Sequence, residues 1–335
     1  MTELTKVHGS QNCFFILDQT ELTTPLSKKE LSALGVQLCD PQSGILGGAD
    51  GLLVVDKGTH EQVAGRMQVV NADGSFASMC GNGLRTVSRY LAEKLGRDHF
   101  VVQTQDADLH VRKHADFAAG VPAYAVEISP VRFNREAMPL DNVGHERLLD
   151  DYVPEFAPAM KFSAIAVPNP HLISFMDEAT LTGPLLGQLG KWLNGNNPYF
   201  SDGVNVNFAQ ILGDNQLFVR TYERGVGFTN ACGTGMSATS LAFVLTHPEH
   251  AQMDQTITVY NPGGMVKTIV HRDLDRYWIE LIGNATFTHH ITVNEGDLHQ
   301  ANVEPDRVKI QVTDEQAAYQ QFVQSMPKIN SLQVR

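Results

Sequence analysis

Two cysteines occupy the same short pattern in opposite halves of the chain. Cys80 opens the run Cys-Gly-Asn-Gly, and Cys232 opens the run Cys-Gly-Thr-Gly. Each run follows strand-like sequence and precedes helix-like sequence, so each cysteine is expected at a helix N-terminus. The partial positive charge there, about half an elementary charge, favours a thiolate. The glycines allow close approach of the backbone to a ligand, and the first N–H groups of a helix can bind an anion.

Two such turns could act together on one substrate carboxylate. One thiolate would remove the proton from the carbon next to the carboxylate, and the opposite thiol would return a proton from the other side. The N–H groups would stabilise the enolate-like intermediate where its charge develops. The repeated pattern therefore predicts racemisation or epimerisation of an amino acid, and it implies no cofactor.

Two interpretations compete with this one. The residues from Gly233 to Ala238 fit the dinucleotide fingerprint G-x-G-x-x-A, which would indicate a nucleotide-dependent oxidoreductase. The run does not open a βαβ unit, and no acidic residue follows at the expected spacing, so this interpretation is disfavoured. A non-catalytic binder of small carboxylates is the third hypothesis. A dehydrogenase would tolerate the loss of Cys80, whereas a binder would tolerate the loss of both thiols.

The composition is that of an acidic globular protein. Of the 335 residues, 42% are hydrophobic and 19% are charged. A globular chain of this length is long enough to form two domains. A net charge of -12 disfavours nucleic acid and anionic membranes as partners and leaves a small-molecule substrate. No leader-like segment and no run of about 18 apolar residues is present, so a cytoplasmic protein is expected. The sequence leaves a homodimer open.

The other cysteines and the histidines give no further site. The four cysteines are scattered and are expected to be free thiols. Cys13 falls in a predicted strand and Cys39 in a predicted loop, and both are interpreted as structural. His110 and His114 lie in strand-like sequence, so no metal is assigned.

Short β-rich runs alternate with fewer helices, which predicts mixed α/β domains. Leu84–Leu95 has one apolar face and ends at Gly96, a residue suited to a left-handed cap. Met236–Leu245 is apolar on almost every side and is expected to be a buried helix. A capping-box pattern at Thr313 predicts a short C-terminal helix. Strands are expected at Asn12–Leu17, Gly51–Val55, Arg66–Val70, His99–Gln103, Tyr124–Ile128, Asn205–Ile211, Leu217–Tyr222, Gln255–Tyr260, Met265–Val270 and Tyr277–Ile282.

Longer motifs around the two cysteines resemble those of the diaminopimelate epimerases. The two signature blocks are Asn71–Ser75 with Met79–Gly83, and Glu223–Gly227 with Ala231–Gly235. Weaker blocks agree in order and spacing as far as about Thr292. They are Lys6–Gly9 with Asn12 and Phe14, Gly48–Gly51, Pro168–His171, and Val204–Asn207. Proline racemases are similar at Cys-Gly-x-Gly but lack the Glu-Arg-Gly run before the second cysteine.

The resemblance implies a fold. Members of this family have two pseudo-symmetric α/β domains, each with a mixed or antiparallel sheet around a central helix, and an active site in the cleft between them. The implied N-terminal domain covers 1–125 and a returning segment at about 286–300. The implied C-terminal domain covers 126–285, and 301–335 form an extension with a short helix.

The same resemblance implies an isomerase that interconverts LL- and meso-2,6-diaminopimelate in lysine and peptidoglycan precursor synthesis, with no cofactor. Cys80 and Cys232 are the implied acid/base pair, assisted by His171 and Glu223. Arg224 suits the distal carboxylate of the substrate through a two-pronged hydrogen bond. The implied substrate-binding residues are Asn12, Asn71, Gly81, Asn82, Asn169, Asn205, Glu223, Arg224, Gly233 and Thr234.

The chain departs from the family pattern at Ser10, Gln11, Cys13 and Phe228. The first three lie near the start of the chain, and Phe228 replaces a glutamate upstream of the second cysteine. Both cysteines and Arg224 are retained. Another two-cysteine amino-acid racemase, a proline-racemase-like isomerase or a carboxylate-binding relative therefore stays open as an alternative.

Overall fold

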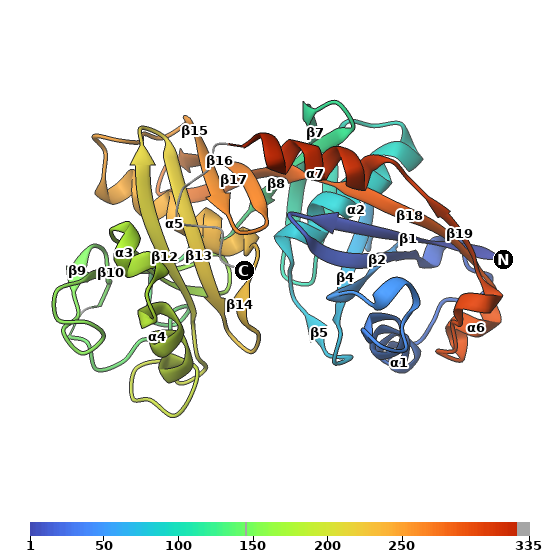
Figure 1. Cartoon of the computed structure of the whole chain (residues 1–335), viewed down its shortest axis with the longest axis horizontal. Coiled ribbons are helices and arrows are strands. Elements are labelled where there is room, and N and C mark those ends of the chain that lie inside the picture. Colours follow the sequence, from blue (N-terminus) through green and yellow to red (C-terminus); the bar gives the residue numbers. More distant parts are fainter. Residues whose placement is uncertain (145, 327–335) are drawn as a thin grey trace. The chain divides into compact units, whose positions relative to one another are not determined.

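The computed structural model describes residues 1–144 and 146–326. The described chain forms two compact units, shown in Figure 1. The first unit consists of Met1–Val126 together with Ile282–Met326, and the second consists of Glu127–Leu281. Both ends of the described chain therefore lie in the first unit.

The first unit is built on one mixed sheet in the order β19-β18-β1-β2-β3-β4-β6-β7-β8, with the short β5 also paired to β4. The β2–β3 and β4–β6 pairs are parallel, and the other pairs are antiparallel. Its strands are β1 Thr2–Gly9, β2 Asn12–Asp18, β3 Gly51–Asp56, β4 Gly65–Asn71, β5 Phe76–Ala77, β6 His99–Gln103, β7 Asp108–Ala118, β8 Val121–Ile128, β18 Thr286–Val293 and β19 Lys309–Val312. Its α-helices are α1 Lys28–Cys39, α2 Gly81–Leu95, α6 Glu295–His299 and α7 Glu315–Ser325.

The second unit has a sheet in the order β9-β10-β11-β12-β13-β15-β16, with β14 also paired to β13. The β11–β12 and β13–β15 pairs are parallel. Its strands are β9 Asp151–Tyr152, β10 Lys161–Ala166, β11 Pro170–Phe175, β12 Asn205–Gly213, β13 Gln216–Glu223, β14 Gly227–Thr229, β15 Thr256–Asn261, β16 Gly264–Asp273 and β17 Arg276–Asn284. Its α-helices are α3 Glu178–Thr182, α4 Leu185–Leu193 and α5 Gly233–Thr246.

The two units share one connectivity. In each, an antiparallel pair (β1–β2, β10–β11) leads through a parallel neighbour (β3, β12) to a long strand (β4, β13). That strand pairs with a short hairpin partner (β5, β14) and, after a helix, with a parallel strand (β6, β15). The helix is α2 in the first unit and α5 in the second. The prediction of two pseudo-symmetric α/β halves is confirmed.

The sequence of each central helix explains its packing. Helix α2 buries Leu84, Val87 and Leu91 and ends at Gly96, whose left-handed conformation (φ 64, ψ 36) lets its N–H bond the Ala92 carbonyl. Helix α5 is buried over almost its whole length, and its small residues allow strands to pack on all sides. Both helices begin three residues earlier than predicted because the Gly-x-Gly runs are helical.

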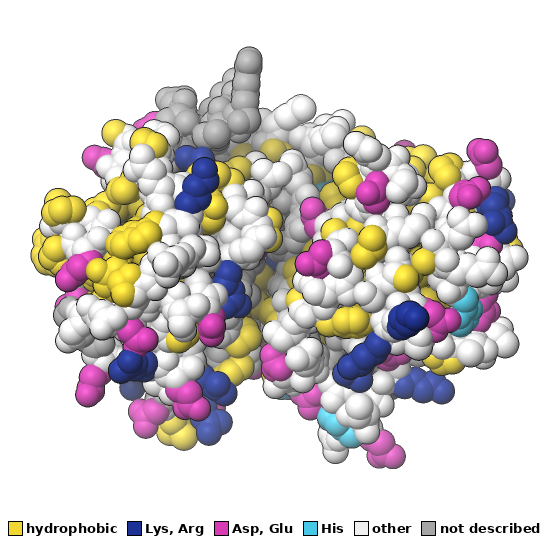
Figure 2. Space-filling model, turned by 90° about the horizontal axis from the view of Figure 1, so that it is seen from below, with side chains coloured by type: hydrophobic (Ala, Val, Ile, Leu, Met, Phe, Trp, Pro, Cys, Tyr) yellow, Lys and Arg dark blue, Asp and Glu magenta, His cyan; other side chains and the backbone are white. Residues whose placement is uncertain are grey.

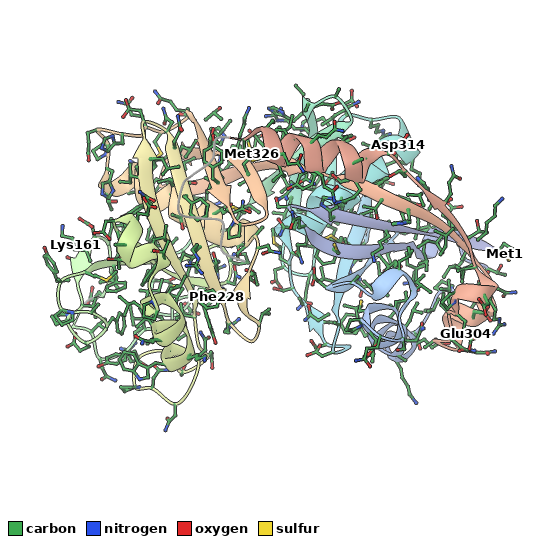
Figure 3. The ribbon with its side chains drawn as sticks, viewed as in Figure 1. Met1, Lys161, Phe228, Glu304, Asp314 and Met326 are labelled. Atoms are coloured by element: carbon green, nitrogen blue, oxygen red, sulfur yellow. The ribbon has the colours of Figure 1, made fainter. Side chains whose placement is uncertain are left out.

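Helix α7 lies along β18, as Figure 1 shows, and Figure 3 labels Asp314 and Met326 at its ends. The predicted capping box at Thr313 is wrong. Asp314 is the N-cap residue and makes no side-chain cap bond. Thr313 instead donates its hydroxyl to the carbonyls of Phe287 and Thr288 in β18. The Thr313 hydroxyl thus bonds to strand β18 instead of capping helix α7.

Helix α1 was missed by the sequence analysis, so the placement of Cys39 in a loop is wrong: Cys39 is the buried last residue of α1. A signal was present in the sequence. The side chain of Ser27 accepts from the Glu30 N–H, and the Glu30 carboxylate accepts from the Ser27 N–H, which together form a capping box. The ten predicted strands are all confirmed within a few residues, and Cys13 lies in β2 as predicted.

Candidate active site

Cys80 is the N-cap residue of α2. Its extended backbone (φ -143, ψ 112) directs the thiol at the helix end, where Sγ accepts from the Gly83 N–H at 3.4 Å. Asn12 Oδ1 lies 4.0 Å from Sγ and accepts from Asn82 Nδ2 at 3.2 Å. Cys80 is half-buried. The described structure therefore brings together three residues of the implied site, namely Cys80, Asn12 and Asn82. Gly81 is the first helical residue of α2.

Asp50 holds Asn12 in this orientation. Its carboxylate accepts from Asn12 Nδ2 at 2.8 Å and from the Cys13 N–H at 2.7 Å. Because the amide nitrogen faces Asp50, the amide oxygen faces Cys80 and Asn82. Asp50 was not predicted as a site residue, although it stands in the Gly48–Gly51 block that carried part of the resemblance. Asn71 lies apart from these contacts, because its side chain donates to Ser75 Oγ at 2.9 Å.

Cys232 is the N-cap residue of α5 in the second unit and repeats the arrangement. Its Sγ accepts from the Gly235 N–H at 3.4 Å and lies 3.6 Å from Thr234 Oγ1. Gly233 is the first helical residue. The side chain of Cys232 is buried, with 6% of its surface exposed. Each unit therefore places one thiol at the positive end of its own central helix, where a thiolate is stabilised.

His171 connects to Cys232 through Thr234. The Nε2 atom of this fully buried histidine lies 3.0 Å from Thr234 Oγ1 and 3.1 Å from Asn169 Oδ1. Its Nδ1 lies 3.1 Å from Asn207 Nδ2, which also donates to two backbone carbonyls and is therefore the amide nitrogen. Nδ1 must then accept, and Nε2 carries the proton. The Nε2–H group can donate to Thr234, whose own hydroxyl proton can point at the Cys232 sulfur.

Asn207 was missed as a site residue. It is fully buried, and its Oδ1 accepts from Thr221 at 2.9 Å, so every polar atom of its amide is used. The sequence carried a weak signal, because Asn207 lies two positions after Asn205 and so faces the same side of a strand.

Burial lowers the pKa of His171 to about 3, and the positive charge of Arg224 acts in the same direction. His171 is therefore neutral at physiological pH in the folded protein. It can orient Thr234 as a hydrogen-bond donor, but it does not serve as a cationic acid.

This lowered pKa predicts a pH-dependent stability. Below pH 6.5 the unfolded chain binds a proton at His171 that the folded chain does not, so stability is lost as the pH falls from 6.5 towards 3. At pH 5 the loss is about 2 kcal/mol relative to pH 8. Urea unfolding of His171→Gln at both pH values should show a pH effect smaller than that of the parent chain by about this amount. An equal pH effect in both proteins would contradict the buried neutral state.

The C-terminal end of β13 and the residue after it carry the last implied residues. Glu223 accepts from Thr229 Oγ1 at 2.6 Å, and the Arg224 N–H donates to Asn205 Oδ1 at 2.9 Å. The exposed Arg224 side chain also donates to the Asp202 carbonyl at 3.1 Å. Phe228, labelled in Figure 3, packs against neighbouring side chains of its unit and fills the position where the family pattern has a glutamate.

The two remaining cysteines are poorly suited to proton transfer. Burial raises the pKa of Cys39 to about 12 and raises that of Cys13, so both thiols stay protonated. Cys13 and Cys39 form no disulfide within the described chain. Among the described residues no cluster of histidine, cysteine and carboxylate side chains could hold a metal ion. In the same part of the chain no helix is long and apolar enough to cross a membrane. On the face shown in Figure 2, basic side chains are scattered among acidic ones.

Comparison with known proteins identifies the family. A family model described as diaminopimelate epimerase matches residues 4–131 and 163–288. The chain belongs to the diaminopimelate epimerase family. It is 53% identical over 330 residues to the diaminopimelate epimerase of Lactiplantibacillus plantarum, with 97% of this chain and 99% of the relative covered. The diaminopimelate epimerase of Enterococcus faecalis is 51% identical over 322 residues, with 96% and 97% covered. Membership of this family makes the chain an isomerase.

Solved structures share the fold at low identity. A Bacillus anthracis phenazine biosynthesis protein of the PhzF family superposes with a TM-score of 0.60 at 11% identity, covering 87% of this chain and 98% of that one. A probable proline racemase from Agrobacterium radiobacter gives 0.57 at 13% identity, covering 92% and 98%. This chain therefore shares its fold with these proteins.

Proposed function

We propose that the chain interconverts LL- and meso-2,6-diaminopimelate by moving the α-proton between Cys80 and Cys232. The observation that carries this proposal is that each thiol is the N-cap of a helix whose own Gly N–H donates to the sulfur. The family and the names of its close relatives support diaminopimelate as the substrate. The product feeds lysine and peptidoglycan precursor synthesis, and we place the reaction in the cytoplasm, where thiols stay reduced.

In the proposed reaction one sulfur begins as a thiolate and the other as a thiol. The thiolate takes the α-proton, and the electron pair left on carbon is delocalised into the carboxylate. The opposite thiol then gives its proton to the other face of the same carbon. The turnover ends with the two protonation states exchanged, so the thiols must exchange protons with solvent before the next turnover in the same direction. No external oxidant, reductant or electron sink is needed.

The helix ends supply the electrostatic part of the reaction. The first N–H groups of a helix have no intrahelical acceptor. At Gly81–Asn82 and Gly233–Thr234 these groups stand beside the two thiols. They are suited to bind the reacting carboxylate and to stabilise the charge that it gains when the proton leaves.

The second thiol has additional support. Because His171 is neutral and donates from Nε2, the Thr234 hydroxyl is free to donate to Cys232 Sγ, and such a bond favours the thiolate. Glu223 is assigned to assist the thiols, and Arg224 is assigned to the distal end of the substrate, which carries a second ammonium and a second carboxylate. A guanidinium can bind that carboxylate through two parallel hydrogen bonds.

Hydrogen isotopes test the reaction without any prior assumption about the residues. The protein is incubated with LL- or meso-diaminopimelate in deuterated water, with no cofactor added. In early turnover the product should carry deuterium at one α-carbon, while the unreacted substrate keeps its hydrogen, because separate groups remove and return the proton. Absence of exchange would support a carboxylate binder. Exchange that required added nucleotide or pyridoxal phosphate would reject the two-thiol reaction.

A further inference from the structure

Arg85 is fully buried in α2, five residues after Cys80. A buried cation costs several kcal/mol unless it is paired with an anion. The next arginine of the helix, Arg89, meets this requirement, since its guanidinium lies 2.6 and 2.7 Å from the two oxygens of Glu315. Within the described chain Arg85 forms no ion pair with any carboxylate. Another kind of group must therefore balance the positive charge of Arg85.

The Arg85 guanidinium lies in a slot that two glycines leave open. A Cβ atom at Gly9 would lie 2.8 Å from Nη2, and one at Gly283 would lie 2.7 Å from Cζ, so neither position could carry a side chain without displacing the guanidinium. Nε donates to the Asn284 carbonyl at 3.3 Å, and Nη2 donates to Ser10 Oγ at 3.5 Å. In the described part of the chain Nη1 has no hydrogen-bond partner. The slot holds the cation, but it does not neutralise it.

Helix α7 closes the slot. Tyr319 is 1% exposed, packs its ring 4.7 Å from that of His8, and is hydrogen-bonded to Ser10. Ser10 itself is fully buried and donates its N–H to Asn284 Oδ1 at 2.8 Å. The C-terminal helix therefore keeps water away from the guanidinium and fixes the turn that leads into Asn12.

The nearby group best able to balance Arg85 is Cys80. A Cβ atom at Gly9 would lie 2.8 Å from Arg85 Nη2 and 3.1 Å from the Asn82 carbonyl oxygen, so the guanidinium lies beside the first turn of α2, which Cys80 opens. Burial lowers the pKa of Arg85 to about 10, and negative charge on Cys80 and Tyr319 acts against this effect. Burial raises the pKa of Tyr319, so its phenol is neutral at physiological pH and Arg85 is still a cation. Cys80 is then the group that can supply the negative charge.

We propose that Arg85 is a positioning residue that keeps Cys80 in the thiolate form, as a buried counter-charge held between Gly9 and Gly283 and sealed by α7. The position equivalent to Arg85 in the second unit, five residues after Cys232, is Ser237, which donates to its own helix at Gly233. The second unit therefore does not repeat this buried cation at the matching position of its helix, where Cys232 instead has the Thr234 hydroxyl beside it.

This inference rests on the proposed acid/base role of Cys80, but its test does not require turnover. The rate of alkylation by iodoacetamide is measured against pH, and mass spectrometry reads Cys80 and Cys232 separately. In Arg85→Met the midpoint for Cys80 should move upward by about one pH unit or more, so that its alkylation at pH 7 slows about tenfold. The midpoint for Cys232 should stay in place. Arg85→Lys retains the charge and should restore most of the rate at Cys80.

Two controls keep the result decisive. Arg89→Lys alters the neighbouring arginine and should leave the Cys80 profile unchanged. If Arg85→Met does not fold, Arg85→Gln takes its place, because Gln can still donate to Asn284 while it removes the charge. An unchanged Cys80 profile in a folded, uncharged variant would overturn the proposal, and so would equal shifts at both cysteines. Full epimerase activity in Cys80→Ser would instead reject the role of the thiol in the reaction and would leave the alkylation result intact.

Discussion

Replacing either Cys80 or Cys232 with serine is expected to lower kcat by about 10³-fold or more, with a smaller change in KM. A positioned acid or base contributes about 10²- to 10⁴-fold to a rate. A serine hydroxyl is too weak an acid to carry the proton at neutral pH. Initial rates with LL- and with meso-diaminopimelate measure the effect in both directions. Since each turnover uses both sulfurs, both variants should lose both directions.

Cys39→Ala is the matched control for these variants. Cys39 is buried in α1, and its raised pKa makes it inert, so the rate should stay close to that of the parent chain. Full activity in Cys80→Ser or in Cys232→Ser would show that the sulfur at that position is not a proton carrier. Loss of activity in all three variants together would indicate a general defect of folding.

The sequence predicted the parts of the site that depend on local chemistry. The Cys-Gly-x-Gly runs identified both N-cap thiols because a glycine-rich helix start is a short-range feature. The same holds for Gly96, whose left-handed conformation ends α2 as predicted. The strands with β-branched and apolar runs were found for the same reason.

The parts that were missed depend on distant segments. Asn207 acts on His171, which lies on a neighbouring parallel strand, and this pairing becomes visible only when β11 and β12 are in register. The sequence analysis did not single out Arg85, because the contacts that bury its side chain include Gly283, nearly two hundred residues away. The local pattern predicted Thr313 as a helix cap. Its hydroxyl instead donates to a carbonyl of β18, a contact that the local sequence does not reveal.

Replacing Arg224 with lysine is expected to lower kcat/KM for diaminopimelate by about 100-fold. A lysine ammonium is a point charge and cannot form the two parallel hydrogen bonds that a guanidinium offers a carboxylate. Hydrogen bonds to charged groups contribute about 1.5–3 kcal/mol, which corresponds to this range of rates. The assay compares kcat/KM of Arg224→Lys with that of the parent chain under the same conditions.

Arg220→Lys is the matched control, because Arg220 lies in β13 close by in sequence and donates to the Leu181 carbonyl instead. This variant should lose little activity. Near-normal kcat/KM in Arg224→Lys would remove Arg224 from the proposed contact with the distal carboxylate. Equal losses in both variants would point to a disturbed β13 rather than to a lost contact.

The division of the chain into two units also sets the order in which these units can be completed during synthesis on the ribosome. Within the described residues the second unit is continuous, so its described part has been made when Leu281 is joined. Strand β1, made first, needs β18 as its outer neighbour, with Thr2 opposite Val293. Until then the N-terminal strand has an open edge and the Arg85 slot lacks its cover. The half that carries Cys80 can therefore mature only after nearly the whole chain has been synthesised, and thus after the half that carries Cys232.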